Sequence, residues 1–254
     1  MNKEQAEQCL ILKCYGGSIT YGTNHADSDT DIKDIFIPPK EYWIGLQNVR
    51  SVEHMSDEFD ICYHSLRHFF DLAIKANPNI LEMLYLRDNM YLTKDVPKHL
   101  RKFGQKLIDN RELFLTKKAK YTYMGYAFSQ LHRMDKLNKN ANTNPKRVAL
   151  VEKHGFDTKN AMHLFRLLRT GLEILTTGEL HVHRADKKFL LEVKDGKYTY
   201  DEVIAEAKRY EGLMEEAVIK SDLPTKPDFN KIENLLIEIV EEVLWNKRIT
   251  INKI

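Results

Sequence analysis

Two carboxylates spaced two residues apart lie early in the chain, on a segment that should form a strand. Asp29 and Asp31 belong to the run DTDIKDIFI, which is rich in Ile and Phe and is followed by Pro38-Pro39. Because side chains alternate between the two faces of a strand, both carboxylates should project from one face. Paired carboxylates of this kind hold Mg²⁺, usually together with the phosphates of a substrate. The spacing therefore predicts a magnesium site.

A glycine turn precedes these carboxylates, in the run GGSITYG. The apolar segment 9–15 predicts a strand that ends at this turn, and Gly17 and Ser18 should begin a helix. Backbone N–H groups at such a turn, together with the positive end of a helix, can hold a polyphosphate. The Ser18 hydroxyl adds a donor, so we expect Gly17 and Ser18 to bind a nucleotide.

A third carboxylate, Asp60, lies on another predicted strand, over residues 58–63. Two metal ions that clamp the attacking and leaving oxygens of a displacement need a further acidic ligand. We therefore expect Asp29, Asp31 and Asp60 to be both the metal ligands and the catalytic residues. Taken singly, Asp-x-Asp and Gly-Gly-Ser are common in loops, and only their order and spacing favour a functional site.

The elements that must position these residues fall into two parts. Strands over 9–15, 29–37 and 58–63, with helical spacing between residues 64 and 85, predict a mixed sheet in an N-terminal domain over residues 1–96. Residues 97–254 are helical in period, which predicts an all-α domain and an α+β fold overall. Its helices should lie near the ranges 97–108, 116–137, 158–177, 200–220 and 230–247, with breaks that include 140–145 and 178–195.

Composition excludes several classes of protein. Of the 254 residues, 43% are hydrophobic and 30% are charged, with 11 Gly and 7 Pro, which excludes collagen-like and wholly disordered chains. No apolar run approaches the ~20 residues of a membrane span, and the polar N-terminus lacks the core of a signal peptide. We expect a cytoplasmic protein without a membrane partner. Three cysteines without CxxC spacing indicate reduced thiols.

Charge is unevenly distributed along the chain despite a net charge of only +2. Residues 1–97 carry 9 Lys and Arg against 15 acidic residues, whereas residues 98–147 carry 13 against 3. This contrast predicts a metal site beside an anion-binding surface. Lys117, Lys118 and Lys120 lie near several aromatic residues, a mixture that can bind a nucleic-acid backbone or form an ordinary solvated helix face.

The order of these motifs resembles the DNA polymerase β nucleotidyltransferase superfamily. Further segments, among them DSDTDIKDIFIPP, FDICYHSLRHFFDLAIKANPNILEMLY and KHGFDTKNAMHLFRLLRTGLEILTTGEL, resemble nucleotidyltransferases of the RNA-repair-pathway type in bacteria and phages, over about residues 10–230. The resemblance implies transfer of a nucleoside monophosphate from an NTP to an acceptor hydroxyl, with two Mg²⁺ ions. The implied acceptor is RNA, either a tRNA or an RNA 3′ end. Asp34 stands where these relatives have glycine, and could disturb the strand or add a carboxylate near the metals.

A second group of candidate residues lies in the helical part. Lys159, His163 and Arg166 are spaced i, i+4 and i+7, so they share one face of the predicted helix 158–177. From spacing alone, a solvated polar face is the simpler interpretation. The resemblance instead implies nucleotide-binding residues, with Lys159 and Arg166 holding phosphate and His163 donating a hydrogen bond.

Two alternatives remain open at this point. The same chemistry can serve a protein or small-molecule hydroxyl, although the basic segment favours RNA. The chain can also be a catalytically silent nucleic-acid-binding module that keeps the fold, although the presence of Asp29, Asp31 and Asp60 argues against this.

Overall fold

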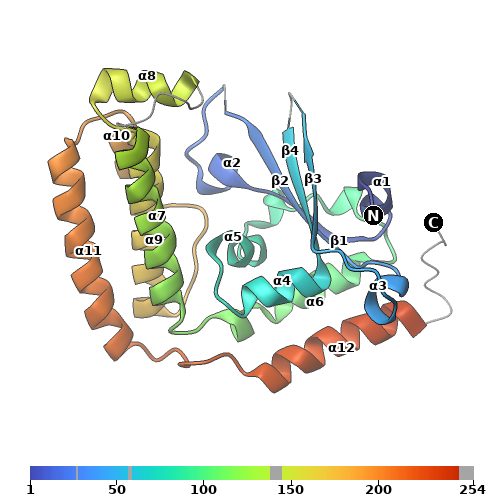
Figure 1. Ribbon diagram of the computed structural model, residues 1–254. Helices are drawn as coiled ribbons and strands as arrows, with labels where there is room; N and C mark the ends of the chain where they lie inside the picture. Colours follow the sequence, from blue (N-terminus) through green and yellow to red (C-terminus); the bar gives the residue numbers. More distant parts are fainter. Residues whose placement is uncertain (27, 57–58, 138–144, 246–254) are drawn as a thin grey trace. The chain divides into compact units, whose positions relative to one another are not determined.

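The computed structural model describes residues 1–26, 28–56, 59–137 and 145–245. Over these residues the chain forms two compact units (Figure 1). The first unit comprises Met1–Phe114 together with the chain from Pro227 onward, and the second comprises Leu115–Lys226.

The first unit is built on a four-stranded sheet with the order β1-β2-β4-β3. Its strands are β1 (Leu10–Tyr15), β2 (Thr30–Phe36), β3 (Ser51–Met55) and β4 (Phe59–Ser65). The two central strands, β2 and β4, run parallel, whereas β1 and β3 pair antiparallel to them. The sheet is therefore mixed, as the sequence predicts.

Helices cover the sheet of the first unit. They are α1 (Lys3–Glu7), α2 (Gly17–Tyr21), α3 (Glu41–Ile44), α4 (Leu66–Ala73), α5 (Pro78–Leu81), α6 (Arg101–Asp109) and α12 (Phe229–Trp245), with short 3₁₀ turns at η1 (Glu82–Leu84), η2 (Asp88–Met90), η3 (Thr93–Asp95) and η4 (Arg111–Phe114). Helix α4 follows β4 directly because Ser65 caps it, accepting a hydrogen bond from the His68 backbone N–H. Helix α5 begins with Pro78 at its first turn, where a missing N–H costs little.

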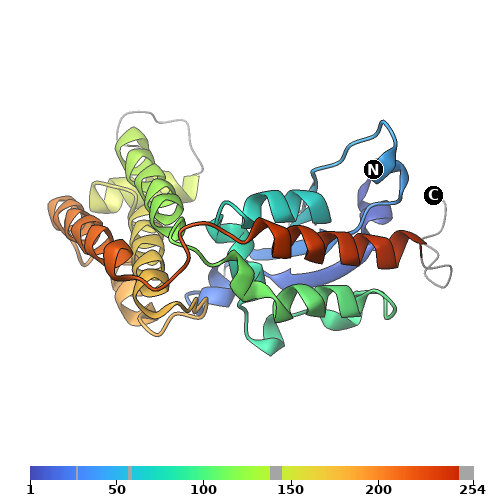
Figure 2. The same cartoon turned by 90° about the horizontal axis from the view of Figure 1, so that it is seen from below.

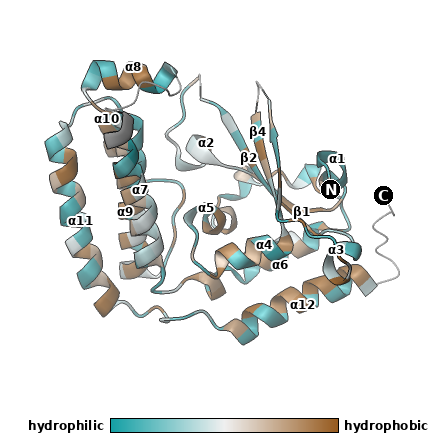
Figure 3. Cartoon of the chain, viewed as in Figure 1, coloured by the Kyte–Doolittle hydropathy of each residue, from teal (hydrophilic) through white to brown (hydrophobic). Residues whose placement is uncertain are grey.

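Two apolar clusters hold the first unit together. On one face of the sheet, Phe36, Ile61 and Tyr63 pack with residues of α1 and the adjoining turn. Elsewhere in the unit, Phe69 and Phe70 of α4 meet Phe114 edge to face. Figure 3 shows the corresponding hydrophobic colouring along β1 and β4.

Helix α12 belongs to this first unit although it is the last described element of the chain. It runs alongside α6 (Figure 2), and two ion pairs, Lys102–Glu242 and Lys106–Glu238, join the two helices. The predicted domain boundary at residues 96 and 97 places both helices in the C-terminal domain. That boundary stays a prediction.

The second unit is a helical bundle centred on α9. Its helices are α7 (Ala119–Leu137), α8 (Pro145–His154), α9 (Thr158–Thr177), α10 (Lys187–Lys194) and α11 (Tyr200–Lys220). Helix α9 is buried along most of its length and packs against α7, α10 and α11. Asp157 caps it by accepting a hydrogen bond from the Asn160 N–H, and α11 begins with a Thr199–Glu202 capping box.

The predicted α+β fold is confirmed, with some elements missed. Strand β3 was not predicted, and α10 occupies the range 178–195 that was expected to be a break. Most of the predicted break at 140–145, and residues 246–247 of the last predicted helix, lie outside the described residues. Among the helices of the described ranges, none combines the length and apolarity needed to cross a bilayer.

Candidate functional site

Asp31 and Asp60 lie side by side on the two central strands. In the parallel pairing of β2 with β4, Asp31 is the register partner of Asp60. Paired positions of neighbouring strands project from the same face of a sheet, so both carboxylates share one face. Each is half-buried. The structure thus brings together two of the three predicted acids.

Asp29 has a different setting from the one expected. Strand β2 begins at Thr30, so Asp29 lies one residue before it and is exposed. Strand alternation therefore does not fix the direction of its side chain. Within the residues that the structure describes, no three His, Cys, Asp or Glu side chains gather closely enough to hold a metal ion.

The predicted glycine turn lies directly against Asp31. The Gly16 N–H donates a hydrogen bond of 2.8 Å to the Asp31 carbonyl oxygen. Gly17 has φ +60°, and a Cβ placed on it would lie 1.8 Å from Asp31 Oδ2. Only glycine fits here, because the backbone is left-handed and the carboxylate occupies the space of a side chain. Ser18 follows within the first turn of α2, next to this contact.

These residues fit a divalent cation bound jointly with a substrate. Mg²⁺ commonly takes one or two carboxylates from the protein and completes its shell with water and phosphate oxygens. Asp31 and Asp60 supply two carboxylates on one face, and the backbone of the glycine turn lies directly against Asp31. The chemistry of this set suits hard cations rather than a closed structural metal site.

Sequence reasoning missed a polar network on the same face. Lys33 follows Asp31 by two residues on β2, and its Nζ lies 3.0 Å from the Asn79 carbonyl oxygen and 4.0 Å from Glu82 Oε2. Glu82 is buried and accepts a 2.8 Å hydrogen bond from the Tyr21 hydroxyl. The spacing of Lys33 from Asp31 was visible in the sequence, but its partners on another element were not.

Asp34 projects from the opposite face of β2 and is fully buried. It pairs with Lys13 at 3.3 Å, directly across the β1–β2 register. Burial raises the pKa of the Asp34 carboxyl to about 7, although the Lys13 ammonium acts in the other direction. The residue found in place of the expected glycine therefore adds no carboxylate beside Asp31.

Two side chains next to Asp60 are neutral at physiological pH. Cys62 and His64 follow it on the same face of β4, with 3.4 Å between Cys62 Sγ and His64 Nε2. Burial raises the pKa of the Cys62 thiol to about 11 and lowers that of His64 to about 4. Neither group adds charge to the acidic pair.

The helical unit carries the second predicted cluster on α9. Burial, followed by the charge of Arg166 and other nearby cations, lowers the pKa of His163 to about 3. Arg166 is buried and Lys159 is half-buried. Lys159, His163 and Arg166 thus share one helix, and the charges of Lys159 and Arg166 also act on His163.

Two residues that the sequence did not suggest add to this cluster. Lys194 ends α10 and its carbonyl accepts a 2.7 Å hydrogen bond from the Thr158 hydroxyl, which brings it to the start of α9. Burial and the charge of Lys159 lower the pKa of Lys194. Arg147 of α8 bonds both carboxylate oxygens of Asp157 at 2.9 Å. Only the fold could reveal this convergence of three helices.

The basic segment 98–147 is less available than its charge suggests. Lys102 and Lys106 pair with α12, and Arg147 pairs with Asp157. Lys120 is buried and pairs with Glu215 of α11. Several of its cations therefore have acidic partners inside their own unit.

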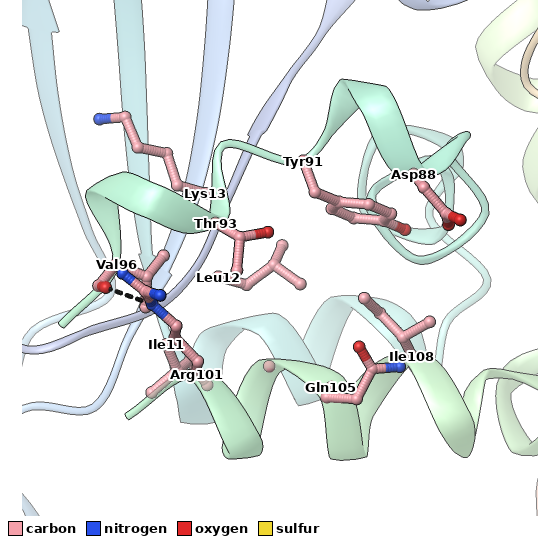
Figure 4. A pocket seen from close by; sticks show the side chains of 11 residues that line it. Ile11, Leu12, Lys13, Asp88, Tyr91, Thr93, Val96, Arg101, Gln105 and Ile108 are labelled. Atoms are coloured by element: carbon pink, nitrogen blue, oxygen red, sulfur yellow. Dashed lines mark hydrogen bonds between the residues drawn. The ribbon is translucent and has the colours of Figure 1, made fainter. Parts of the chain in front are cut away.

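A cavity of about 190 Å³ lies elsewhere in the first unit, at the outer edge of β1 (Figure 4). It is bounded by β1, the segment from η2 to η3, and α6, with Tyr91, Thr93 and Gln105 among its lining residues. Asp31 and Asp60 are not part of its wall. The cavity is therefore separate from the candidate site.

Comparisons with known proteins agree with this arrangement. The family model described as RlaP, the RNA repair pathway DNA polymerase beta family, matches residues 2–238. An uncharacterized 38.9 kDa protein from the nrdC-mobD intergenic region of Enterobacteria phage T4 is 36% identical over 129 residues, which are 47% of this chain and 37% of that protein. The uncharacterized protein YcgL of Bacillus subtilis (strain 168) is 31% identical over 120 residues, which are 46% of this chain and 44% of that protein.

The chain thus matches less than half the length of either relative. The family model, by contrast, extends over nearly the whole chain and includes the glycine turn, both paired carboxylates and helix α9. The predicted resemblance is confirmed, and the chain belongs to the RNA repair pathway DNA polymerase beta family.

Proposed function

We propose that this protein transfers a nucleoside monophosphate from an NTP to an acceptor hydroxyl. The observation that carries the proposal is the register of Asp31 with Asp60, on one sheet face and beside the side-chain-free turn at Gly17. Two carboxylates next to a glycine turn suit phosphoryl chemistry, in which positioning and charge neutralisation supply most of the rate enhancement.

In the proposed reaction the acceptor oxygen attacks the α-phosphorus as the bond to the pyrophosphate oxygen breaks. Asp29, Asp31 and Asp60 are the proposed ligands of two Mg²⁺ ions, which when bound neutralise charge on the triphosphate. Asp60 assists the attacking hydroxyl by accepting its proton. Gly17 and Ser18 contact phosphate oxygens through the backbone and the Ser18 hydroxyl.

We assign the cluster on α9 to phosphate binding as well. Lys159 and Arg166 provide positive charge, and the neutral imidazole of His163 can donate one hydrogen bond. Arg147 and Lys194 add further charge in the same unit. Bidentate Arg and point-charge Lys are the side chains that proteins use for phosphate groups.

RNA is the proposed acceptor, either as a tRNA or as an RNA 3′ end. The support comes from family membership, since the ion pairs within segment 98–147 weaken the argument from charge alone. A protein or small-molecule hydroxyl would use the same acids and the same displacement.

Labelled NTPs, Mg²⁺ and a pool of cellular RNA provide the test. Each NTP is incubated with the wild type, with Asp31→Asn and with Asp60→Asn, and label on RNA is measured against label on protein. We expect RNA labelling by the wild type and a loss of at least ~100-fold in both variants, the scale on which lost positioning slows such reactions. Unchanged turnover in Asp31→Asn refutes the metal assignment, and label on protein alone refutes RNA as the acceptor.

A further inference from the structure

Lys33 connects the candidate site to a buried network behind it. Its aliphatic stem lies along the glycine turn, since a Cβ on Gly16 would be 3.1 Å from Lys33 Cε and 3.3 Å from Asp31 Cβ. Lys33 and Asp31 therefore occupy the same face of β2 and touch the same turn. The ammonium group continues past the turn to the Asn79 carbonyl and to Glu82.

Glu82 ties that ammonium to the helix that follows the turn. It lies at the start of η1 and is only 4% exposed, so its carboxylate requires partners in the protein. Tyr21, which donates a hydrogen bond to it, is the last residue of α2 and is also buried. The network thus joins β2, η1 and the end of α2, and α2 starts at Gly17.

We propose that Lys33 is a positioning residue, which, anchored by Glu82 and Tyr21, holds the Gly16–Gly17 turn against the Asp31 carboxylate. This role rests on the proposed nucleotidyl transfer, in which the turn and Asp31 act on the same triphosphate. The aliphatic stem of Lys33 supports the turn. This stem is held in place because the ammonium group at its end pairs with Glu82. Positioning of this kind is worth large rate factors, because displacements of about 1 Å slow such reactions by about 100-fold.

Two kinds of measurement test the proposal. The first is transfer kinetics for Lys33→Met, Lys33→Arg and Tyr21→Phe. We expect Lys33→Met to lower kcat by roughly 30-fold or more, with less than a threefold change in KM for the NTP, and Lys33→Arg to recover most of that loss. Because Lys33 and Tyr21 act through one carboxylate, the double variant should be little worse than Lys33→Met alone.

The second measurement is hydrogen exchange of the peptide that contains residues 16–22, together with Mn²⁺ affinity measured by electron paramagnetic resonance without nucleotide. Lys33→Met and Tyr21→Phe should both speed exchange in this peptide and weaken Mn²⁺ binding. Tyr63→Phe is the matched control, because the buried Tyr63 hydroxyl bonds Glu7 at 2.9 Å on the other sheet face. It should leave both readouts unchanged.

The proposal and the function that it rests on fail in different ways. Unchanged exchange over residues 16–22 in Lys33→Met, or additive effects of Lys33→Met and Tyr21→Phe on kcat, overturns the positioning role. Absence of transfer by the wild type with any NTP overturns the proposed function instead, and the exchange data still decide whether Lys33 orders the turn.

Discussion

Gly17 shows how strongly a single residue can constrain the geometry of the candidate site. Two separate features require glycine at this position. Its φ is +60°, and an added Cβ would lie only 1.8 Å from Asp31 Oδ2. A side chain at this position must move the carboxylate or the turn. Either movement breaks the close contact between the turn and the Asp31 carboxylate.

We accordingly expect Gly17→Ala to lower kcat by at least ~100-fold and to destabilise the first unit by roughly 1–3 kcal/mol. Gly125→Ala in α7 is the control, because a Cβ there meets nothing within 4 Å. Transfer rates and urea denaturation check both effects. Full activity in Gly17→Ala would contradict the close contact with Asp31.

Asp34 gives the first unit a pH-dependent stability. Its pKa of about 7 in the folded protein lies above the ordinary carboxyl value, so the folded state binds its proton more tightly than the unfolded state. Stability from this group is fully present below about pH 4 and is lost as pH rises to about 7, by roughly 4 kcal/mol. The charged groups facing it are Lys13, Glu7 and Asp95.

Asp34→Asn should therefore flatten the pH dependence of unfolding between about pH 4 and 7 and stabilise the protein at about pH 8. Both tryptophans, Trp43 and Trp245, belong to the first unit, so their fluorescence reports its unfolding. Asp222→Asn, at an exposed position of the other unit, should leave the profile unchanged. A pH profile of Asp34→Asn that matches the wild type would exclude Asp34 as its source.

The residues themselves were predictable to different degrees. The Asp-x-Asp spacing and the glycine turn indicated Asp31 and Gly17 as candidates, since both signals are local, but alternation did not extend to Asp29, which precedes β2. Asp31 and Asp60 are neighbours only because strand β2 pairs with strand β4, and sequence periodicity does not specify which strands pair. Lys33 was missed because its significance depends on Glu82, a residue far along the chain on another element.

At the scale of elements, apolar spacing identified the long helices and failed for short or polar segments. Helix α9 has a broad buried stripe, and its predicted range agrees with Thr158–Thr177. Strand β3 reads SVEHM, with exposed and half-buried positions alternating, so it lacks the apolar run of a central strand. Helix α10 has eight residues and buries only Leu190 and Val193, so it is shorter than the roughly 11–18 residues over which a helical period can be recognised.

The ion pair between α7 and α11 leads to a prediction about one lysine of the basic segment. Lys120 is 7% exposed, and its ammonium meets Glu215 and the ring of Tyr121. We expect Lys120→Ala to destabilise the helical unit by about 1 kcal/mol, through lost packing of the stem more than through lost charge. Lys118→Ala, at a half-buried position, should cost less. Urea denaturation followed by circular dichroism distinguishes them, and equal costs would contradict a structural role for Lys120.

At the scale of the whole molecule, charge is organised differently from its distribution along the sequence. Segment 98–147 has the largest excess of positive charge, yet Lys102, Lys106 and Lys120 face acidic residues of later helices. Around α9, by contrast, burial and nearby cations together lower the pKa of His163 and of Lys194. A linear count of charges could not reveal this difference, because the acidic partners lie far along the chain.

The salt dependence of RNA binding should follow the folded arrangement. Each phosphate contact with a single strand contributes about 0.7 to the slope of log affinity against log salt. Lys159→Ala should therefore reduce the slope by about 0.7, whereas Lys102→Ala should leave it unchanged. Lys117 and Lys118 remain the candidates for an acceptor surface in segment 98–147, and an unchanged slope in their double alanine variant would exclude them.

Helix α12 gives the first unit a discontinuous chain, with the helical unit inserted between Phe114 and Pro227. On the ribosome, the sheet and its glycine turn emerge first, yet the helix that pairs with Lys102 and Lys106 emerges only after the entire insertion. During that interval α6 exposes the surface that α12 later covers, while the inserted helices can already fold on local contacts. The unit that carries Asp31 and Asp60 is thus begun before the helical unit and completed after it, so the uncovered surface of α6 needs protection from aggregation during synthesis.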